Sequence, residues 1–206
     1  MGNNVFDNRR DLQIVSRLIE PDSRVLDLGC GDGKFLAHLQ KSKNASVLGL
    51  ELEQEKILQC IANGVPVIQR NLNSNLDFAD DKSFDYVILS HTLQELDNPD
   101  RLLGEIVRVG KKAVVSFINF GYFPNRLQLL FTGRMPRNKS LPHEWYNTPN
   151  IHLGTLHDFR DLCSALNIKI VSETPIAARF PRLTSVWPNW FAVGCVFVLE
   201  KSGKQH

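Results

Sequence analysis

Three glycines stand at alternate positions between two apolar segments early in the chain. They are Gly29, Gly31 and Gly33. Glycine tolerates positive φ, so a turn of this composition lets a ligand approach the backbone closely. Further along, Glu51 follows the apolar segment 46–50, and an acidic side chain there can accept hydrogen bonds from both hydroxyls of a ribose. This spacing predicts a site for a nucleoside cofactor where a strand meets the N-terminus of a helix.

The spacing also separates the classes of nucleoside cofactor. The dinucleotide fingerprint Gly-x-Gly-x-x-Gly, begun at Gly29, requires glycine at position 34, where this chain has Lys34. The pattern from Asp27 to Gly33 instead resembles motif I of the class I S-adenosylmethionine (SAM)-dependent methyltransferases. In that family the loop backbone holds the methionyl end of SAM, and the acidic residue after the second strand holds the ribose. A turn without a ligand and a nicotinamide or flavin site are the alternatives.

The same resemblance assigns further contacts to the ends of later strands. The residue after the third strand is commonly aspartate and binds the adenine amino group. Here it is Asn71, whose side-chain carbonyl can still accept that hydrogen bond, and Leu72 is expected against the ring. The predicted cofactor-binding residues are Asp27, Gly29, Gly31, Gly33, Glu51, Leu52, Asn71, Leu72 and Ser90.

Catalytic residues are not assigned by the sequence. His91 lies in the loop 90–96, where methyltransferases of this class bring substrate groups beside the methyl group, and the ordinary pKa of histidine suits a general base. A surface or capping histidine is the alternative. Methyl transfer from a sulfonium is an in-line displacement that positioning can largely drive, so a base is not required. Histidines and cysteines show no metal-ligand spacing, and we expect no metal site.

Composition bounds the class of protein. The 206 residues carry a formal net charge of +2, which by itself implies neither nucleic acid nor an anionic membrane as a partner. No run approaches the ~18 apolar residues that a membrane helix needs, and residues 1–10 lack the apolar core of a signal peptide. The four cysteines are scattered without a Cys-x-x-Cys pair, as is typical of reduced thiols. We therefore expect a soluble, cytoplasmic protein.

Apolar and amphipathic segments alternate along most of the chain. Strands are expected at residues 24–28, 46–50, 67–69, 84–90, 113–118, 168–171 and 191–199, the last two joined without a helix. Helices are expected at about 8–20, 34–39 and 53–63, after Asn98 and after Thr155. The alternation predicts an α/β fold, a Rossmann-like, seven-stranded, mainly parallel sheet with helices on both faces, as in class I methyltransferases. We expect residues 1–206 to form a single domain.

Residues 119–152 interrupt this alternation and are expected to form an insert. The segment is rich in aromatic residues, prolines and arginines, and contains one short helical piece at about 124–132. A loop of this length is usually a lid, a binding surface or disordered, and the aromatic content argues against disorder. Basic and aromatic side chains together also suit RNA, but the charges are dispersed, which leaves nucleic acid as a minor alternative.

A closer resemblance, to the methionine biosynthesis protein family MetW, extends from about residue 9 to 175. The insert is its most diagnostic part, with Gly133-Arg-Met-Pro136 and Glu144-Trp-Tyr146. The chain departs from the family at Asn71, where aspartate is more usual, and at His91, where glutamine is more usual. The other matching segments are 10–12, 25–33, 84–90, 92–94, 108–110, 119–121, 126–129, 148–152 and 158–159.

The resemblance implies a SAM-binding, methyltransferase-like protein of methionine biosynthesis, alongside homoserine O-acyltransferase, whose activity some members support. One hypothesis is a binding module whose insert docks on the acyltransferase. The alternative is a SAM-dependent methyltransferase acting on an unidentified small molecule or protein, with RNA methylation as a minor alternative. The expected substrate or partner surface comprises His91, Asn119, Trp145, Tyr146 and His152.

A third hypothesis joins the first two. SAM is a downstream product of methionine, so a partner of the acyltransferase that also binds SAM can report the level of the end product. This requires SAM to change the affinity of the complex by a coupling free energy, typically ~1–3 kcal/mol.

Overall fold

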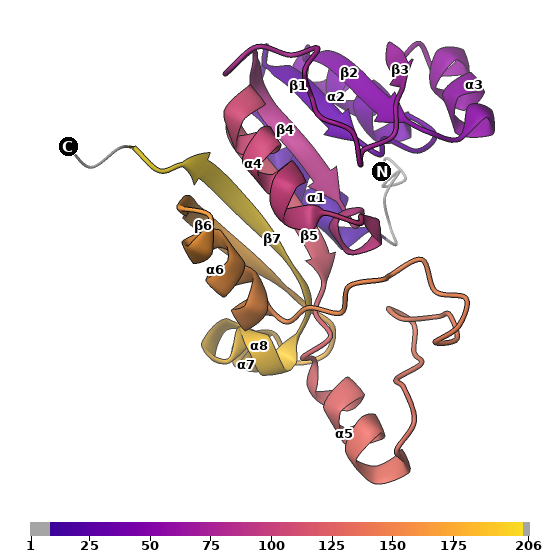
Figure 1. The fold of residues 1–206 in the computed structure, drawn as a ribbon, viewed down its shortest axis with the longest axis vertical. Coiled ribbons are helices and arrows are strands. Elements are labelled where there is room, and N and C mark those ends of the chain that lie inside the picture. The colour runs from indigo at the N-terminus through magenta and orange to yellow at the C-terminus, as the bar shows by residue number, and fades with distance from the viewer. Residues whose placement is uncertain (1–8, 204–206) are drawn as a thin grey trace.

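Seven strands form one sheet in the computed structural model, which describes residues 9–203 (Figure 1). The strand order is β3-β2-β1-β4-β5-β7-β6, and neighbouring strands are parallel except where β7 pairs with β5 and β6. This confirms the expected seven-stranded, mainly parallel sheet. The strands are β1 (Arg24–Leu28), β2 (Ser46–Glu51), β3 (Val67–Gln69), β4 (Phe84–Ser90), β5 (Gly110–Ile118), β6 (Ile168–Ala177) and β7 (Ala192–Lys201).

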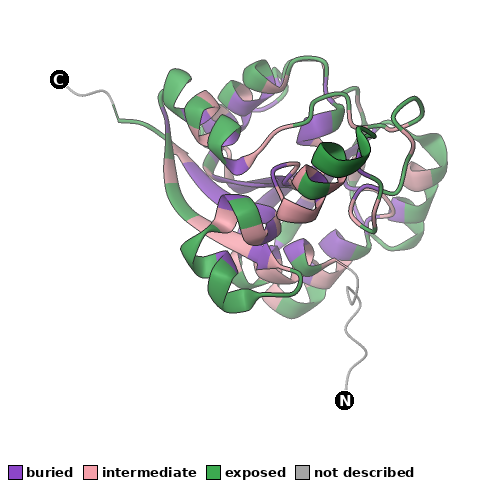
Figure 2. Cartoon of the chain, turned by 90° about the horizontal axis from the view of Figure 1, so that it is seen from below, coloured by how far each residue is buried: buried purple, intermediate pink, exposed green. Residues whose placement is uncertain are grey.

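Helices cover both faces of the sheet. Helices α1, α2 and α3 contribute to an apolar cluster on one face, and α4 and α6 contribute to a cluster on the other, where Figure 1 shows them in front of the strands. Buried segments concentrate in the sheet and on the inner sides of the helices (Figure 2). The helices are α1 (Arg10–Leu18), α2 (Lys34–Lys43), α3 (Gln54–Ala62), the 3-10 helix η1 (Leu93–Glu95), α4 (Pro99–Val109), α5 (Phe123–Thr132), α6 (Leu156–Ala165), α7 (Pro181–Val186) and α8 (Pro188–Phe191).

The parallel strands explain why residues far apart in the sequence meet at one edge. Strands β1 to β5 all run in the same direction, so their carboxyl ends lie along the same side of the sheet. The glycine turn follows β1, Glu51 ends β2, Asn71 follows β3 and Ser90 ends β4. In open α/β sheets this edge is where ligands bind.

The insert leaves the sheet at the end of β5 and returns at the start of α6 (Figure 1). Helix α5 ends at Gly133, which adopts a left-handed φ of 61°, and residues 133–155 contain neither helix nor strand. At the return, Thr155 Oγ1 accepts a hydrogen bond from Asp158 N, and the Asp158 carboxylate accepts one from Thr155 N. This reciprocal capping box confirms the helix start that the sequence predicts.

The connection between β6 and β7 differs from the expectation of a link without a helix. It contains α7 and α8, which begin at Pro181 and Pro188. Proline suits the first turn of a helix, because its missing N–H has no partner there and its fixed φ is already helical. Strand β6 also continues to Ala177 through Pro175, beyond the expected end at residue 171. Because β6 lies at the edge of the sheet, Pro175 does not interrupt the hydrogen bonds between two central strands.

Three further boundaries differ from the predicted ones. Strand β5 begins at Gly110, not at residue 113, because Gly110 is already extended directly after α4. Helix α2 continues to Lys43 and ends at Asn44, whose φ of 53° is left-handed. Helix α1 covers Arg10–Leu18, whereas the prediction was about 8–20. Residues 1–8, on which the absence of a signal core depends, lie outside the described residues.

Candidate functional site

The turn between β1 and α2 holds its three glycines in the left-handed region. The φ values of Gly29, Gly31 and Gly33 are 77°, 60° and 73°. A Cβ at Gly29 would lie 2.9 Å from Thr92 Oγ1, and one at Gly33 would lie 2.9 Å from Cys60 Sγ. A Cβ at Gly31 would meet no protein atom within 4 Å. Gly29 and Gly33 therefore allow close packing of the loop, whereas Gly31 faces space that a ligand can enter.

Glu51, the last residue of β2, is held beside this loop by main-chain N–H groups. Its Oε2 accepts a hydrogen bond from Gly31 N at 2.8 Å, and its Oε1 accepts from Leu52 N at 2.7 Å and Glu53 N at 3.1 Å. Only 7% of Glu51 is exposed. The three donors fix the orientation of the carboxylate, and Oε2 retains a lone pair for another donor. This arrangement fits a ligand with hydroxyl groups, as a ribose has.

The remaining residues predicted to contact adenosine lie at the same edge of the sheet. Leu52 exposes its side chain directly after Glu51, and Arg70 N donates a hydrogen bond to Glu51 O at 3.0 Å, which ties the ends of β2 and β3 together. Asn71 Oδ1 accepts a hydrogen bond from Asn73 N at 2.9 Å, so one of its two lone pairs is already used. Leu72 packs half-buried against the apolar core.

Asp27 is a buried carboxyl in β1, directly before the glycine turn. Burial raises the pKa of Asp27 to about 7. The positive charge of Arg9 opposes this rise, and the negative charges of Glu51 and Asp11 add to it. Asp27 therefore changes charge near neutral pH, and its ionised form favours a cationic ligand beside the loop.

A polar network lies at the ends of β4 and β5. Arg9 donates two hydrogen bonds to Asp11, at 2.9 Å from Nε and 2.8 Å from Nη2. Ser90 Oγ donates to Asp11 Oδ2 at 2.6 Å, accepts from Arg9 Nη2 at 2.8 Å and lies 3.1 Å from Ser116 Oγ. A hydroxyl has one donor and two acceptor positions, so these partners occupy the side chain of Ser90. The cofactor contact that the sequence predicts for Ser90 stays a prediction, and in this arrangement other side chains engage the hydroxyl.

Asp11 carries the negative charge of this network and Arg9 the positive charge. Burial works against ionisation of Asp11, but the hydrogen bond from Arg9, the nearby His91 and the bond from Ser90 together hold the pKa of Asp11 well below its ordinary value. Asp11 is thus a buried carboxylate with a full set of partners. A buried carboxylate with charged and hydroxyl donors positions its neighbours rigidly.

His91, the first residue after β4, is held in an unusual backbone conformation. Its φ is 59°, and its N–H donates to Ser116 O at 2.9 Å. His91 Nε2 lies 3.7 Å from Asp11 Oδ2. Burial lowers the pKa of His91, although the charge of Asp11 opposes this, so the ring is neutral at pH 7. A neutral, partly exposed imidazole at this edge can accept a proton from a group that approaches it.

Sequence reasoning missed Arg9, Asp11 and Ser116. One signal was available, because Asp11 stands four residues before Val15 and eight before Ile19, both fully buried, which puts a carboxylate on the apolar face of α1. A charge on that face requires a buried partner. Ser116 likewise interrupts the apolar run of β5. Arg9 had no comparable signal, because it lies just outside the helix.

Gln94, in η1, joins the site edge to the end of the insert. Its Nε2 donates to Ile118 O and His152 O, both at 3.2 Å, and its Oε1 accepts from Ile118 N at 3.0 Å. Its main-chain oxygen accepts from Ile151 N at 2.9 Å and from His152 N at 3.1 Å. Thr92, two residues earlier, packs against Gly29. A continuous set of contacts thus connects the glycine turn with residues 151–152.

We expect Gln94→Met to destabilise the protein by about 2 kcal/mol, because it leaves the partly buried main-chain groups of Ile118 without their side-chain partner. The end of the insert should also become more sensitive to limited proteolysis. Urea denaturation and a proteolysis time course measure both effects. The exposed Gln59→Met is the matched control and should change neither. Equal stability of the two variants would contradict a role for Gln94 in holding the insert.

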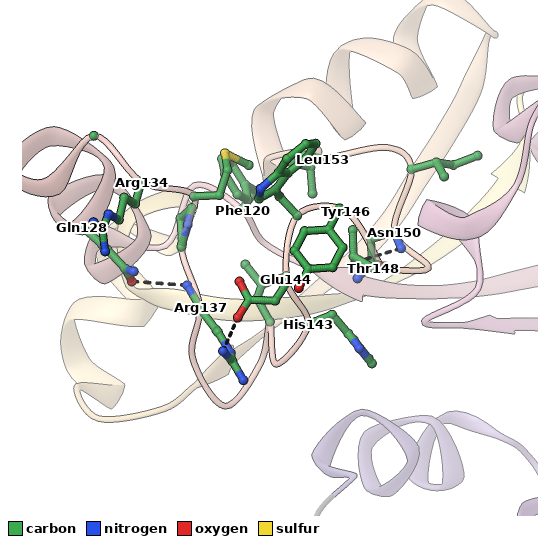
Figure 3. A pocket seen from close by; sticks show the side chains of 16 residues that line it. Phe120, Gln128, Arg134, Arg137, His143, Glu144, Tyr146, Thr148, Asn150 and Leu153 are labelled. Carbon is green, nitrogen blue, oxygen red and sulfur yellow. Dashed lines mark hydrogen bonds and ion pairs between the residues drawn. The ribbon is translucent and has the colours of Figure 1, made fainter.

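The insert lines a cavity of about 1040 Å³ that is open to solvent on one side (Figure 3). Buried Leu141 and half-buried Phe120 contribute to its wall, together with Gln128 and Gly133 at the end of α5. Figure 3 shows Arg137 held between two partners, since its main-chain N donates to Gln128 Oε1 at 3.3 Å and its guanidinium pairs with Glu144. The remaining lining residues are Arg134, Met135, Pro136, His143, Trp145, Tyr146, Thr148, Asn150, Ile151 and Leu153.

The residues predicted to form a partner surface fall into different environments. Trp145 and Tyr146 are 72% and 69% exposed, and their rings pack edge to face with centroids 5.7 Å apart. His152 is exposed beside Gln94, and His91 lies at the network described above. Asn119 does not belong to the surface. It is fully buried, and its Nδ2 donates to main-chain oxygens of Asn189 and Ala192, so it anchors the start of the insert.

Other kinds of site are not indicated within residues 9–203. No three His, Cys, Asp or Glu side chains gather there as metal ligands would. The four cysteines are buried and free. None of the described helices combines the length and apolar character required to cross a membrane.

Comparison with known proteins connects this geometry to a family. The family model for methionine biosynthesis protein MetW matches residues 9–199. A bifunctional methionine biosynthesis protein MetXA/MetW from Rhodopirellula baltica is 38% identical over 172 residues, which are 79% of this chain and 28% of the relative. A ubiquinone biosynthesis O-methyltransferase from Hahella chejuensis is 29% identical over 64% of this chain and 59% of its own length. The chain thus spans less than two thirds of either curated relative.

Solved structures share the fold at low sequence identity. A SAM-dependent methyltransferase from Thermotoga maritima matches with a TM-score of 0.66 and 18% identity, covering 93% of this chain and 87% of that one. One from Mesorhizobium loti matches with a TM-score of 0.66 and 17% identity, covering 92% and 97%. The cyclase SpnF also matches, with a TM-score of 0.66 and 15% identity over 94% and 81%. The fold is therefore that of class I methyltransferases, and fold alone does not establish methyl transfer. By its sequence the chain belongs to the methionine biosynthesis protein MetW family.

Proposed function

We propose that this protein binds SAM and acts in methionine biosynthesis as a methyltransferase-like partner of homoserine O-acyltransferase. The partner role rests on one observation. In the relative named MetXA/MetW, the part that is similar to this chain is fused to a longer additional sequence in the same polypeptide. We infer that its MetXA portion is the acyltransferase. Fusion in one chain keeps two proteins at a high effective concentration relative to each other, which favours their binding to one another.

The contacts at the sheet edge support SAM as the ligand. Gly31 offers an approach free of side chains, and main-chain N–H groups hold the Glu51 carboxylate beside it, where it can accept from the hydroxyls of a ribose. We assign the ribose to Glu51, the adenine surroundings to Leu52, Asn71 and Leu72, and the methionyl end to the glycine turn. SAM would supply a methyl group on a positively charged sulfonium, and the ionised form of Asp27 adds a favourable charge nearby.

The partner role is tested with the two purified proteins. We expect co-elution of this protein with homoserine O-acyltransferase in size-exclusion chromatography and a higher acyltransferase rate in the mixture. Because contacts run from Gly29 through Thr92 and Gln94 to His152, we expect SAM to change the affinity of the complex. Allosteric coupling typically changes an affinity by about 5- to 150-fold. Equal affinity with and without SAM would contradict the coupling, and the absence of both co-elution and stimulation would contradict the partner role itself.

A methyltransferase reaction at the same edge is the second candidate function. The observation in its favour is His91, a neutral imidazole at the end of β4 whose Nε2 lies 3.7 Å from the buried Asp11 carboxylate. The imidazole would accept the proton of a nucleophile while the glycine turn and Glu51 position the methyl donor. Formation of S-adenosylhomocysteine with a candidate small molecule or protein, lost in the His91→Phe variant but not in His157→Phe, tests this role.

A further inference from the structure

The cavity of the insert opens through a rim of unusually exposed aromatic side chains. We refer to the cavity together with Trp145, Tyr146 and Ile151 as the insert groove. More than half of each of these three residues is exposed, which is uncommon for large apolar groups that line one pocket. Aromatic residues next to a depression are typical of the centres of protein interfaces.

Positive charge predominates in the segment that forms the groove. The segment 119–155 contains Arg126, Arg134, Arg137 and Lys139 against a single acidic residue, Glu144, so it is more basic than the chain as a whole. Arg126 stacks on Trp190 with its Cζ 4.4 Å from the ring centroid, and Arg137 pairs with Glu144. Within residues 9–203, Arg134 and Lys139 have no ion pair. These two cations therefore favour a partner with carboxylates.

The groove is preorganised for binding. Asn125 Oδ1 accepts from Asn138 Nδ2 at 2.7 Å, and Asn138 exchanges main-chain hydrogen bonds with Leu141 at 2.9 and 3.1 Å. Gln94 fixes the other end of the segment at His152. An irregular loop that is already ordered loses less conformational entropy when a partner binds. A surface with this support is therefore suited to docking.

A protein segment fits the groove better than a nucleic acid does. Binding to a phosphate backbone depends on many cationic contacts. The groove is lined by two arginines, Arg134 and Arg137, and Arg137 is already paired with Glu144. Slightly more than half of the surface that lines the groove is apolar, as in a protein interface taken as a whole.

We propose that the insert groove docks a segment of the acyltransferase that combines an apolar anchor with flanking carboxylates. The anchor would enter the cavity beside Trp145 and Tyr146. One carboxylate would meet Arg134, which lines the groove, and a second would meet the exposed Lys139 in the same loop. This inference rests on the proposed function, because it specifies the surface by which that partner is bound. It also separates the partner site from the SAM site, which uses the ends of β1 to β3.

The experiment measures the dissociation constant of the complex by biolayer interferometry with immobilised acyltransferase. We expect the double variant Trp145→Ala/Tyr146→Ala to bind at least 10-fold more weakly, and Arg134→Glu to bind more weakly and with a smaller dependence on salt. The matched control, Leu58→Ala/Ile61→Ala on α3, removes equally exposed apolar side chains and should stay within two-fold of the wild type. Circular dichroism verifies that each variant is folded.

Three other outcomes would contradict this inference, and one of them would also contradict the proposed function. If the wild type binds the acyltransferase and both groove variants bind as tightly, the groove is not the docking surface, although the proposed function stands. If the wild type does not bind the acyltransferase, the proposed function and this inference both fail. If the wild type instead binds a single-stranded RNA oligonucleotide and the groove variants do not, the surface belongs to nucleic acid and the inference is overturned.

Discussion

Gly31→Ala is expected to weaken SAM binding by at least ~30-fold, about 2 kcal/mol, while the protein stays folded. The added methyl group would project from a residue with φ of 60° into the space that we assign to the ligand, where no protein atom lies within 4 Å. An alanine in this conformation costs roughly 1–2 kcal/mol of backbone strain. Isothermal titration with SAM measures the loss of affinity, and thermal unfolding measures the strain.

The chain contains a matched control for the backbone effect. Gly64, directly after α3, has φ of 72°, and a Cβ there also meets no atom within 4 Å. Gly64→Ala should therefore lose stability by a similar amount and keep the wild-type affinity for SAM. If both variants bind SAM equally, strain alone accounts for any change, and Gly31 does not face the cofactor.

The glycine turn and Glu51 could be predicted from the sequence because their chemistry is local. Three alternate glycines with an acidic residue one strand later require only a short strand, a turn and a helix to meet. The structure confirms the left-handed turn and adds that Gly31 and Glu51 are hydrogen-bonded to each other. That contact could not be derived from spacing, because it depends on the pairing of β1 with β2.

The buried network was harder to predict because it depends on tertiary contacts across long separations. Ser90 was expected to face a cofactor, yet Asp11 and Arg9, about 80 positions earlier, occupy its hydroxyl. Two signals were available: Asp11 is a carboxylate on the apolar face of a helix, and Ser116 interrupts an apolar strand. An apolar pattern shows which face is buried, but it does not identify the partner of a buried charge.

The insert, too, could be predicted only in part from the sequence. Its extent and its aromatic, basic character were visible in the composition, but the difference between Asn119 and Trp145 was not. Nothing in the local sequence separates these two residues, because both have polar groups and lie in an irregular segment. Only the fold shows that Asn119 is buried and Trp145 is exposed. The two short helices before β7 escaped prediction for a related reason. Proline breaks a helix in its interior but suits the first turn, and the predicted connection without a helix left out the second possibility.

The second large effect is expected from the pH dependence of stability, through Asp27. Its pKa of about 7 in the folded protein is above the ~3.9 of an unfolded aspartate. Between pH 4 and 7 the folded state therefore binds more protons than the unfolded state, so the free energy of unfolding must fall as pH rises through this range. Three pKa units correspond to roughly 4 kcal/mol, which is the upper limit of the effect.

Asp27→Asn isolates this contribution because asparagine has nearly the same shape and does not titrate. The wild type should lose stability relative to the variant as pH rises from 4 to 7.5, by up to a few kcal/mol in urea denaturation. Asp11 acts in the opposite direction and at lower pH, since its lowered pKa confines its effect to the acid side of pH 4. His91 is present in both proteins, so its titration largely cancels in the difference. Parallel stability curves across this range would mean that Arg9 keeps Asp27 ionised, and a permanently negative Asp27 would then face the cationic ligand at every physiological pH.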